Sequence, residues 1–248
     1  MNKKLFWLSL IGVLASFAGG FLLANSLNRK EISTLQSENE TLKKNQAEPI
    51  DESEDFTLGD DEIKQKIAEA DLNPQNVAFQ KNLGLALYNY ASMKKNAELL
   101  GEVLRLITRV YNDNPNDYEA IVTLGNINFD IGYFRENNEN LQKAREFYLK
   151  ALAIKPDDVE IRTDLGLTYL LANPPEDEQA IENFEKSLKT NPKHEKTLQV
   201  MIQALLNEKK RNEAEKFITR LKEINPNNQI LSELDSTSAD SENKSRKQ

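Results

Sequence analysis

Residues 165–192 have the sequence LGLTYLLANPPEDEQAIENFEKSLKTNP, and this stretch decides the fold. It begins with a Leu-Gly pair and ends with an Asn-Pro pair. The Leu-Gly pair also occurs at 83–84 and 124–125, each 41 residues from the next. Pairs of the form X-Pro recur at a similar spacing, at 73–74, 114–115, 155–156, 191–192 and 225–226. Self-similarity at this period is typical of stacked supersecondary units that bury one continuous core together.

Each unit is predicted to be a pair of amphipathic helices. In the second unit, apolar residues at helical spacing fall on one face of the second helix: Leu141, Ala144, Tyr148, Ala151 and Leu152. The proline that follows cannot continue a helix, because it lacks an N–H and its ring clashes with the preceding turn. The first two units are seven residues longer than a 34-residue repeat. In the second unit the extra residues fall between the helices, around 132–140. Seven residues are close to two helical turns, so the helices could lengthen without losing register; we favour a tolerated surface insertion, and an edge that grips a partner is the functional alternative.

The pattern resembles the tetratricopeptide repeat (TPR), which has Leu-Gly and Tyr in its first helix, Ala and Phe in its second, and a closing Pro. The third unit matches at Leu165, Gly166, Tyr169, Ala180, Phe184 and Pro192, whereas the fourth has Met201-Ile202 where Leu-Gly is expected. The resemblance covers about residues 75–226. It implies an all-α solenoid of about four helical hairpins, in which glycine lets a neighbouring helix approach closely.

Composition argues against enzymatic chemistry. The chain has 248 residues, a formal net charge of −8, nine glycines, one histidine (His194) and no cysteine. These counts disfavour thiolate zinc sites, thiol nucleophiles and Ser-His-Asp triads. The sequence contains no glycine-rich phosphate loop, and its acidic balance disfavours nucleic acid as a partner. We therefore expect no enzyme activity, no cofactor and no bound metal.

Residues 1–30 are predicted to be an N-terminal transmembrane anchor. Residues 5–24, LFWLSLIGVLASFAGGFLLA, carry no charge, and a helix of that length reaches roughly 30 Å, the thickness of the hydrocarbon core. Lys3 and Lys4 precede this stretch, and a short basic stub usually stays in the cytoplasm. We expect a single-pass helix of the cell inner membrane, of bacterial type, with the repeats facing the periplasm. The alternative is a cleavable signal peptide.

Further segments are predicted on either side of the repeats. Residues 31–46 form a helical stalk, and Ile32, Leu35, Asn39 and Leu42 have the spacing of a short coiled coil. Anchor and stalk would then pair two chains as a homodimer; the alternative is a monomeric stalk. Residues 47–62 carry eight acidic residues and no basic one, and we assign 47–60 to a solvated acidic linker. The solenoid is assigned to 61–235, with a leading helix at 60–72 that covers the first unit, and 236–248 to a disordered tail.

In TPR proteins the first helices line the concave side, and fixed offsets from the Leu-Gly pair mark the residues that face a partner. By this resemblance the partner-binding groove consists of Lys81, Leu85, Tyr88, Asn89, Val122, Asn126, Phe129, Asp130, Thr163, Leu167, Gln199 and Gln203. Apolar anchors mixed with amides suit an extended or helical peptide. A plain surface position or packing between repeats is the alternative for about half of these residues. Glu160 and Asp164 stand where a chaperone-tail clamp would need basic residues, so we do not expect that ligand.

These features predict a membrane-anchored TPR adaptor or scaffold that binds a protein or peptide through its concave groove. One anchor followed by repeats is a layout similar to that of the TPR proteins of c-type cytochrome biogenesis. The resemblance implies a role in that process or in envelope protein assembly. The alternative is a dimeric structural component of a cell-envelope complex, and a self-association measurement on residues 1–50 would distinguish the two.

Overall fold

The computed structural model describes residues 59–234, and within that range every regular element is helical. The helices are α3 (Asp60–Leu72), α4 (Val77–Met93), α5 (Ala97–Asp113), α6 (Tyr118–Phe134), α7 (Asn138–Ile154), α8 (Val159–Leu170), α9 (Asp177–Thr190), α10 (Glu195–Asn207) and α11 (Arg211–Ile224). A further helical turn follows at residues 229–234. The all-α prediction is confirmed for this part of the chain.

The chain divides into two compact units, residues 1–66 and 67–248, with the boundary inside α3. α3 is the leading helix predicted at 60–72, but its last residue, Leu72, is 82 % exposed instead of packed on the first repeat. Between residues 59 and 234 there is no helix long and apolar enough to span a lipid bilayer. The predicted anchor (5–24), stalk (31–46) and tail (236–248), and nearly all of the linker (47–60), lie outside the described residues.

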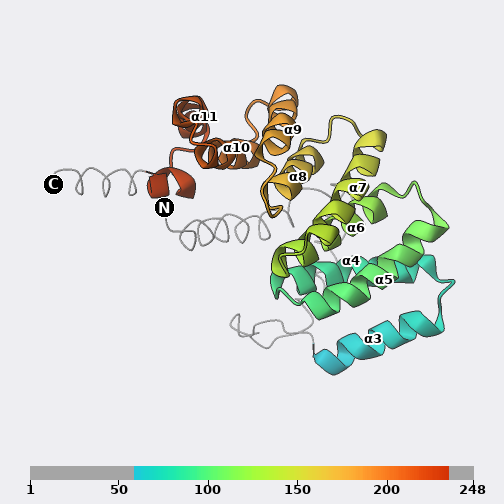
Figure 1. Cartoon of the computed structure of the whole chain (residues 1–248). Helices are drawn as coiled ribbons and strands as arrows, with labels where there is room; N and C mark the ends of the chain where they lie inside the picture. Colours follow the sequence, from blue (N-terminus) through green and yellow to red (C-terminus); the bar gives the residue numbers. More distant parts are fainter. Residues whose placement is uncertain (1–58, 235–248) are drawn as a thin grey trace, which may run out of the picture. The chain divides into compact units, whose positions relative to one another are not determined.

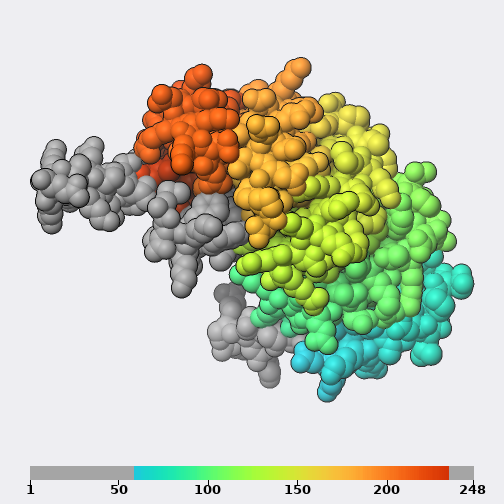
Figure 2. Space-filling model, in the orientation of Figure 1, coloured from blue at the N-terminus to red at the C-terminus, as the bar shows by residue number. Residues whose placement is uncertain are grey.

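The repeats form four consecutive helical hairpins, α4–α5, α6–α7, α8–α9 and α10–α11 (Figure 1). Each second helix packs on the first helix of the next hairpin, and the first helices also meet, α4 with α6 and α8 with α10. Successive hairpins therefore follow one another as adjoining bands of colour (Figure 2). This arrangement confirms the predicted TPR-type solenoid of about four repeats, with the first helices as one layer and the second helices as the other.

The helices of a hairpin approach closely where the sequence has its Leu-Gly pairs. A Cβ atom on Gly125 of α6 would lie 2.6 Å from Cε1 of Tyr148 on α7, and one on Gly84 of α4 would lie 2.5 Å from Cδ1 of Ile107 on α5. Both distances are far shorter than a van der Waals contact between carbon atoms. Tyr148 is 1 % exposed, so its ring occupies the space that a side chain at position 125 would need.

The extra residues of the first two repeats lengthen the helices. α4, α5, α6 and α7 have 17 residues each, whereas α10 and α11 have 13 and 14. α6 runs to Phe134 and α7 begins at Asn138, so residues 132–140 hold two helix ends and a short turn. The favoured surface insertion between these helices is therefore wrong, and the alternative of longer helices holds. The added length is close to two helical turns in total, so it leaves the apolar faces in register.

Three of the four hairpins share one turn geometry. A non-glycine residue with positive φ lies in each turn: Lys95 (53°), Glu136 (51°) and Lys209 (61°). The N–H of the next residue then donates to a carbonyl five residues earlier, as in a Schellman motif: Asn96 to Ala91, Asn137 to Gly132 and Lys210 to Leu205, each at 2.8 Å. These short turns fix the pairing of the two helices in each hairpin.

Candidate functional site: polar residues on the first helices

Polar side chains on the first helices form a group that we call the inner cluster: Tyr88 and Ser92 of α4, Asp130 of α6, Asp164 of α8 and Lys196 of α10. The Tyr88 hydroxyl donates to Oδ2 of Asp130 at 3.2 Å, which joins the first repeat to the second. Nζ of Lys196 lies 2.6 Å from Oδ1 of Asp164, which joins the third to the fourth. The inner cluster therefore includes residues from all four repeats.

Asp130 is a carboxylate without a cationic partner. Burial, with a smaller contribution from the nearby Asp164 charge, raises the pKa of Asp130 to about 6, although the hydroxyls of Ser92 and Tyr88 partly oppose the rise. Within residues 59–234 no lysine, arginine or histidine forms an ion pair with Asp130. Neutral hydroxyls stabilise an ionised carboxylate less than a cation does, so this site favours an added positive charge.

Asp164 has a cation within the chain. Burial raises the pKa of Asp164, and the ammonium of Lys196 opposes that rise. Nζ of Lys196 also lies 3.4 Å from Oε2 of Glu160, so one ammonium serves two carboxylates. Burial alone would lower the pKa of Lys196, but Asp164 and Glu160 raise it above its ordinary value. The fourth repeat thus supplies the positive charge that the third repeat needs.

The structure separates the predicted groove residues by accessibility. Thr163 is fully buried and Leu167 is 1 % exposed; Phe129 and Gln199 are also buried. Phe129 and Leu167 belong to the hydrophobic core, so we correct their expected position as groove-facing side chains. Thr163 packs between repeats instead, because its hydroxyl contacts those of Ser187 and Thr197. Lys81, Leu85, Tyr88, Val122, Asn126, Asp130 and Gln203 are half-buried, and Asn89 is exposed.

Several of the accessible residues already have partners within the chain. The Tyr148 hydroxyl donates to Oδ1 of Asn126 at 2.9 Å, so that amide oxygen already accepts one hydrogen bond. Nε2 of Gln203 donates to Oδ1 of Asn207 at 3.3 Å. Nζ of Lys81 lies 2.9 Å from the carboxylates of both Asp117 and Glu119 on the next repeat. Asp130 and Tyr88 are the members of the predicted groove that retain an unneutralised charge and an aromatic ring beside it.

Three members of the inner cluster are absent from the predicted groove: Ser92, Asp164 and Lys196. Asp164 had a usable signal: it follows Glu160 by four residues, which puts both acids on one face of α8. Lys196 follows Glu160 by 36 residues, which is the spacing between the third and fourth Pro pairs. Ser92 had no such signal, because nothing in its own sequence marks the position of Asp130 on the next repeat.

The comparisons with known proteins agree with this architecture. A family model described as tetratricopeptide repeat matches residues 178–234, and another with the same description matches residues 125–158. Both of these segments are therefore similar to tetratricopeptide repeats. None of the curated proteins matches the sequence. No group of three or more His, Cys, Asp or Glu side chains that could hold a metal ion occurs in the described part of the chain.

Solved structures share the fold. A crystal structure of MamA has a TM-score of 0.53 and 23 % identity, and the match covers 66 % of this chain and 86 % of that chain. The crystal structure of TTC0263, a thermophilic TPR protein in Thermus thermophilus, has a TM-score of 0.52 and 16 % identity, and the match covers 73 % of this chain and 90 % of that chain. Likeness at these identities establishes the solenoid fold.

Proposed function

We propose that this chain is a membrane-anchored TPR adaptor or scaffold that binds a segment of a partner protein at its inner cluster. The repeats and the solenoid support the adaptor or scaffold role. The uncharged residues 5–24 and the preceding lysines support an anchor in the inner membrane with the repeats in the periplasm. Envelope protein assembly or c-type cytochrome biogenesis is the setting that the layout favours.

The observation that carries the proposal is the state of Asp130. The inner cluster contains two carboxylates and one ammonium, and that ammonium lies on Asp164. Asp130 keeps neutral partners, and burial holds its pKa near 6. A cationic group of a partner protein would therefore form an ion pair with a carboxylate that no group of the described repeats neutralises. Lysine and arginine are the side chains that bring such a charge to a protein surface.

The surroundings of Asp130 also suit the stem of a long basic side chain. Tyr88 is half-buried, and its hydroxyl is fixed on Asp130, so its ring lies beside the carboxylate. Aromatic rings attract cations through their faces and pack against methylene groups. We therefore propose that the partner segment contains a lysine or arginine that bonds to Asp130 and lies along Tyr88.

The test is a phage-display selection. The full-length protein, purified in detergent, serves as the bait for a library of random peptides. Peptides retained by the wild type should be enriched in lysine or arginine at one position. Asp130→Asn keeps the shape of the side chain and removes its charge, so it should lose that enrichment. Asp113→Asn is the matched control, because Asp113 is exposed at the end of α5.

Equal enrichment with the wild type and with Asp130→Asn would contradict the proposed site. Retention of neutral peptides alone would contradict the proposed chemistry of the partner. Crosslinking of the full-length protein in membranes, followed by identification of the captured chain and the crosslinked residues, would then locate the partner contact at another surface.

A further inference from the structure

Two aromatic side chains from the first and second repeats meet on the layer of second helices. Tyr111, in the last turn of α5, and Phe147 of α7 pack edge to face, with ring centroids 5.7 Å apart. Nζ of Lys150, also on α7, lies 5.1 Å from the ring centroid of Tyr111 and 5.0 Å from that of Phe147. It also donates to the Tyr111 hydroxyl at 3.0 Å. The ammonium is therefore held over two rings, although Lys150 itself is exposed.

A second lysine is held in the same way at the end of α7. Nζ of Lys155, the residue that follows this helix, lies 3.7 Å from the ring centroid of Tyr118, the first residue of α6. Tyr111 and Tyr118 precede and follow the loop between α5 and α6, so both rings come from the junction between the first two repeats. Ile154 lies between the two lysines in the sequence and is 42 % exposed. We call six residues the lysine–aromatic patch: Tyr111, Tyr118, Phe147, Lys150, Ile154 and Lys155.

Lys150 has no carboxylate partner among the described residues, although one is available on its own helix. Lys186 occupies the same position one repeat later, and its Nζ lies 2.7 Å from Oε1 of Glu182, four residues earlier. Lys150 has the exposed Glu146 at that same offset, yet the two form no ion pair. A glutamate four residues before a lysine is the favourable order for a pair on a helix surface. The two rings and the hydroxyl of the neighbouring helix therefore hold the ammonium in preference to Glu146.

Lys155 likewise forms no ion pair within residues 59–234. The carboxylate on the ring that holds it is Asp158, and that carboxylate is already engaged. Oδ2 of Asp158 accepts from the Tyr118 hydroxyl, and Oδ1 accepts from the N–H of Ile161 in the first turn of α8. Asp158 therefore caps a helix and fixes the tyrosine, and the ammonium of Lys155 lies on the ring instead.

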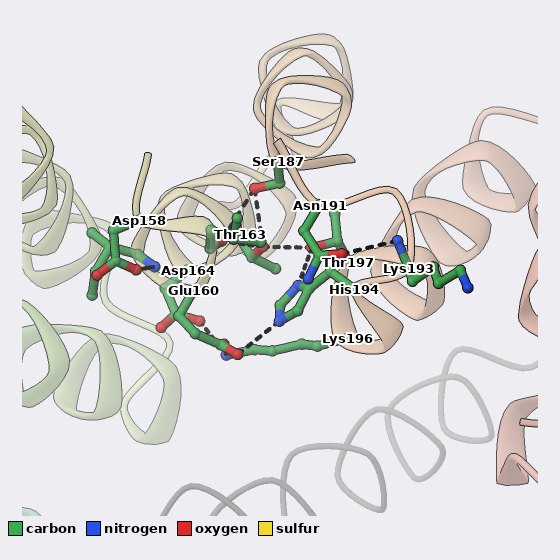
Figure 3. A network of polar contacts seen from close by, with 12 residues as sticks. Asp158, Glu160, Thr163, Asp164, Ser187, Asn191, Lys193, His194, Lys196 and Thr197 are labelled. Carbon is green, nitrogen blue, oxygen red and sulfur yellow. Dashed lines mark hydrogen bonds and ion pairs between the residues drawn. The ribbon is translucent and has the colours of Figure 1, made fainter. Parts of the chain in front are cut away.

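The lysines of first helices that join two repeats have carboxylate partners. At the third junction, the ammonium of Lys196 lies 2.6 Å from Oδ1 of Asp164 (Figure 3). At the first junction, Lys81 binds both Asp117 and Glu119. The lysine–aromatic patch joins the first two repeats as well, but its two positive charges meet ring faces and a hydroxyl. A ring face attracts a cation without carrying a net charge, so both charges of the patch stay unneutralised.

We propose that the lysine–aromatic patch is a second docking site, which binds an acidic segment of a protein partner. Each ammonium donates to a carboxylate of that segment, and an apolar residue of the segment packs on Ile154. Charge complementarity selects this partner, because the patch offers two cations and no free anion. The rings already hold each ammonium in the unbound protein, so binding of a carboxylate orders less of the lysine side chain. Aromatic side chains of this kind are also enriched at protein–protein interfaces.

A phage-display selection with the full-length Asp130→Asn protein as the bait tests the proposal. This bait lacks the Asp130 charge, so neither outcome depends on the site proposed at the inner cluster. Retained peptides should be enriched in aspartate or glutamate close to an apolar residue. One such peptide, labelled with fluorescein, is then titrated by fluorescence anisotropy. Adding Lys150→Gln to the bait should weaken binding of this peptide about fivefold, and adding Lys155→Gln as well should weaken it further.

Lys143→Gln is the matched control, because it removes the same charge from the same helix at a lysine that pairs with Glu139. Added to the bait, it should leave the affinity for the peptide unchanged. Equal losses with Lys143→Gln and Lys150→Gln would reveal attraction to net charge alone and would overturn the proposal. A selection without acidic enrichment, or an acidic peptide that binds equally well after Lys150→Gln, would also overturn it.

Discussion

At the residue scale, the missing side chain of Gly125 sets how closely the two helices of the second hairpin approach. The ring of Tyr148 fills the space beside it, and its Cε1 would lie 2.6 Å from a Cβ atom. Gly101 is the opposite case, because no atom lies within 4 Å of a Cβ at that exposed position of α5. The two glycines therefore differ in packing, while both lie within 17-residue helices.

We predict that Gly125→Leu lowers the free energy of unfolding by about 1–3 kcal/mol or more, since overpacking forces neighbours out of position. Gly101→Leu should leave stability unchanged or raise it slightly, because leucine has the higher helix propensity. Thermal unfolding followed by circular dichroism measures both. Gly125→Leu should also be more damaging than replacement of any accessible groove residue. Equal melting temperatures for the two variants would show that the assigned helix contact is wrong.

Asp130 is expected to lower stability at neutral pH. Its pKa in the folded chain is about 6, above the ordinary value of 3.8, so the folded state binds the proton more tightly than the unfolded state. Its contribution to stability is full below pH 3.8 and is lost as the pH rises through 6. Asp130→Asn should therefore raise the free energy of unfolding by about 1–3 kcal/mol at pH 7 and much less at pH 4. Urea unfolding at the two pH values measures the difference, and a destabilised Asp130→Asn at pH 7 would be inconsistent with a buried, unneutralised carboxylate.

At the scale of elements, the sequence predicts the hairpins but not the lengths of their helices. The Leu-Gly and X-Pro spacing locates the third repeat correctly, because each of its marker residues has a fixed packing role in the hairpin. For the extra residues of the second repeat the sequence favoured an insertion over longer helices, since a period of 41 does not say whether a helix or a turn has grown. The sequence predicted Asp130 as a groove residue. It could not predict that Asp130 has hydroxyl partners and no cation, because those partners, Ser92 and Tyr88, belong to another repeat. Phe129 was misplaced for a related reason: a solenoid buries some positions of the first helix beneath its neighbours.

The turn at Glu136 gives a prediction at this scale. Glu136 is exposed and has a φ of 51°, a conformation that costs a non-glycine residue roughly 1–2 kcal/mol. Glu136→Gly should raise the free energy of unfolding by up to about 1 kcal/mol, because the greater freedom of glycine in the unfolded chain offsets part of the gain. Glu136→Ala is the control and should give no such gain. Chemical denaturation distinguishes the two, and equal stability of both variants would show that the positive φ carries no cost.

At the scale of the whole molecule, the solenoid follows the proposed membrane anchor in the sequence. Protease added to intact spheroplasts should digest the repeats if they face the periplasm, because the enzyme reaches only that side of the inner membrane. A cytoplasmic protein in the same sample serves as the control for membrane integrity. Full protection of the repeats, with digestion only after lysis, would contradict the proposed orientation.

The most direct test of the central claim, that Asp130 accepts a cation from a partner, is the pH dependence of binding to the full-length protein. A lysine peptide from the phage selection would be titrated between pH 5 and 7 by fluorescence anisotropy. Asp130 has a pKa of about 6 when unoccupied, so only its ionised fraction is ready to bind the cation. The affinity of the wild type should rise about tenfold over this range, and that of Asp130→Asn should stay nearly constant. An affinity that does not change with pH in the wild type, or that rises equally in Asp130→Asn, would contradict the claim.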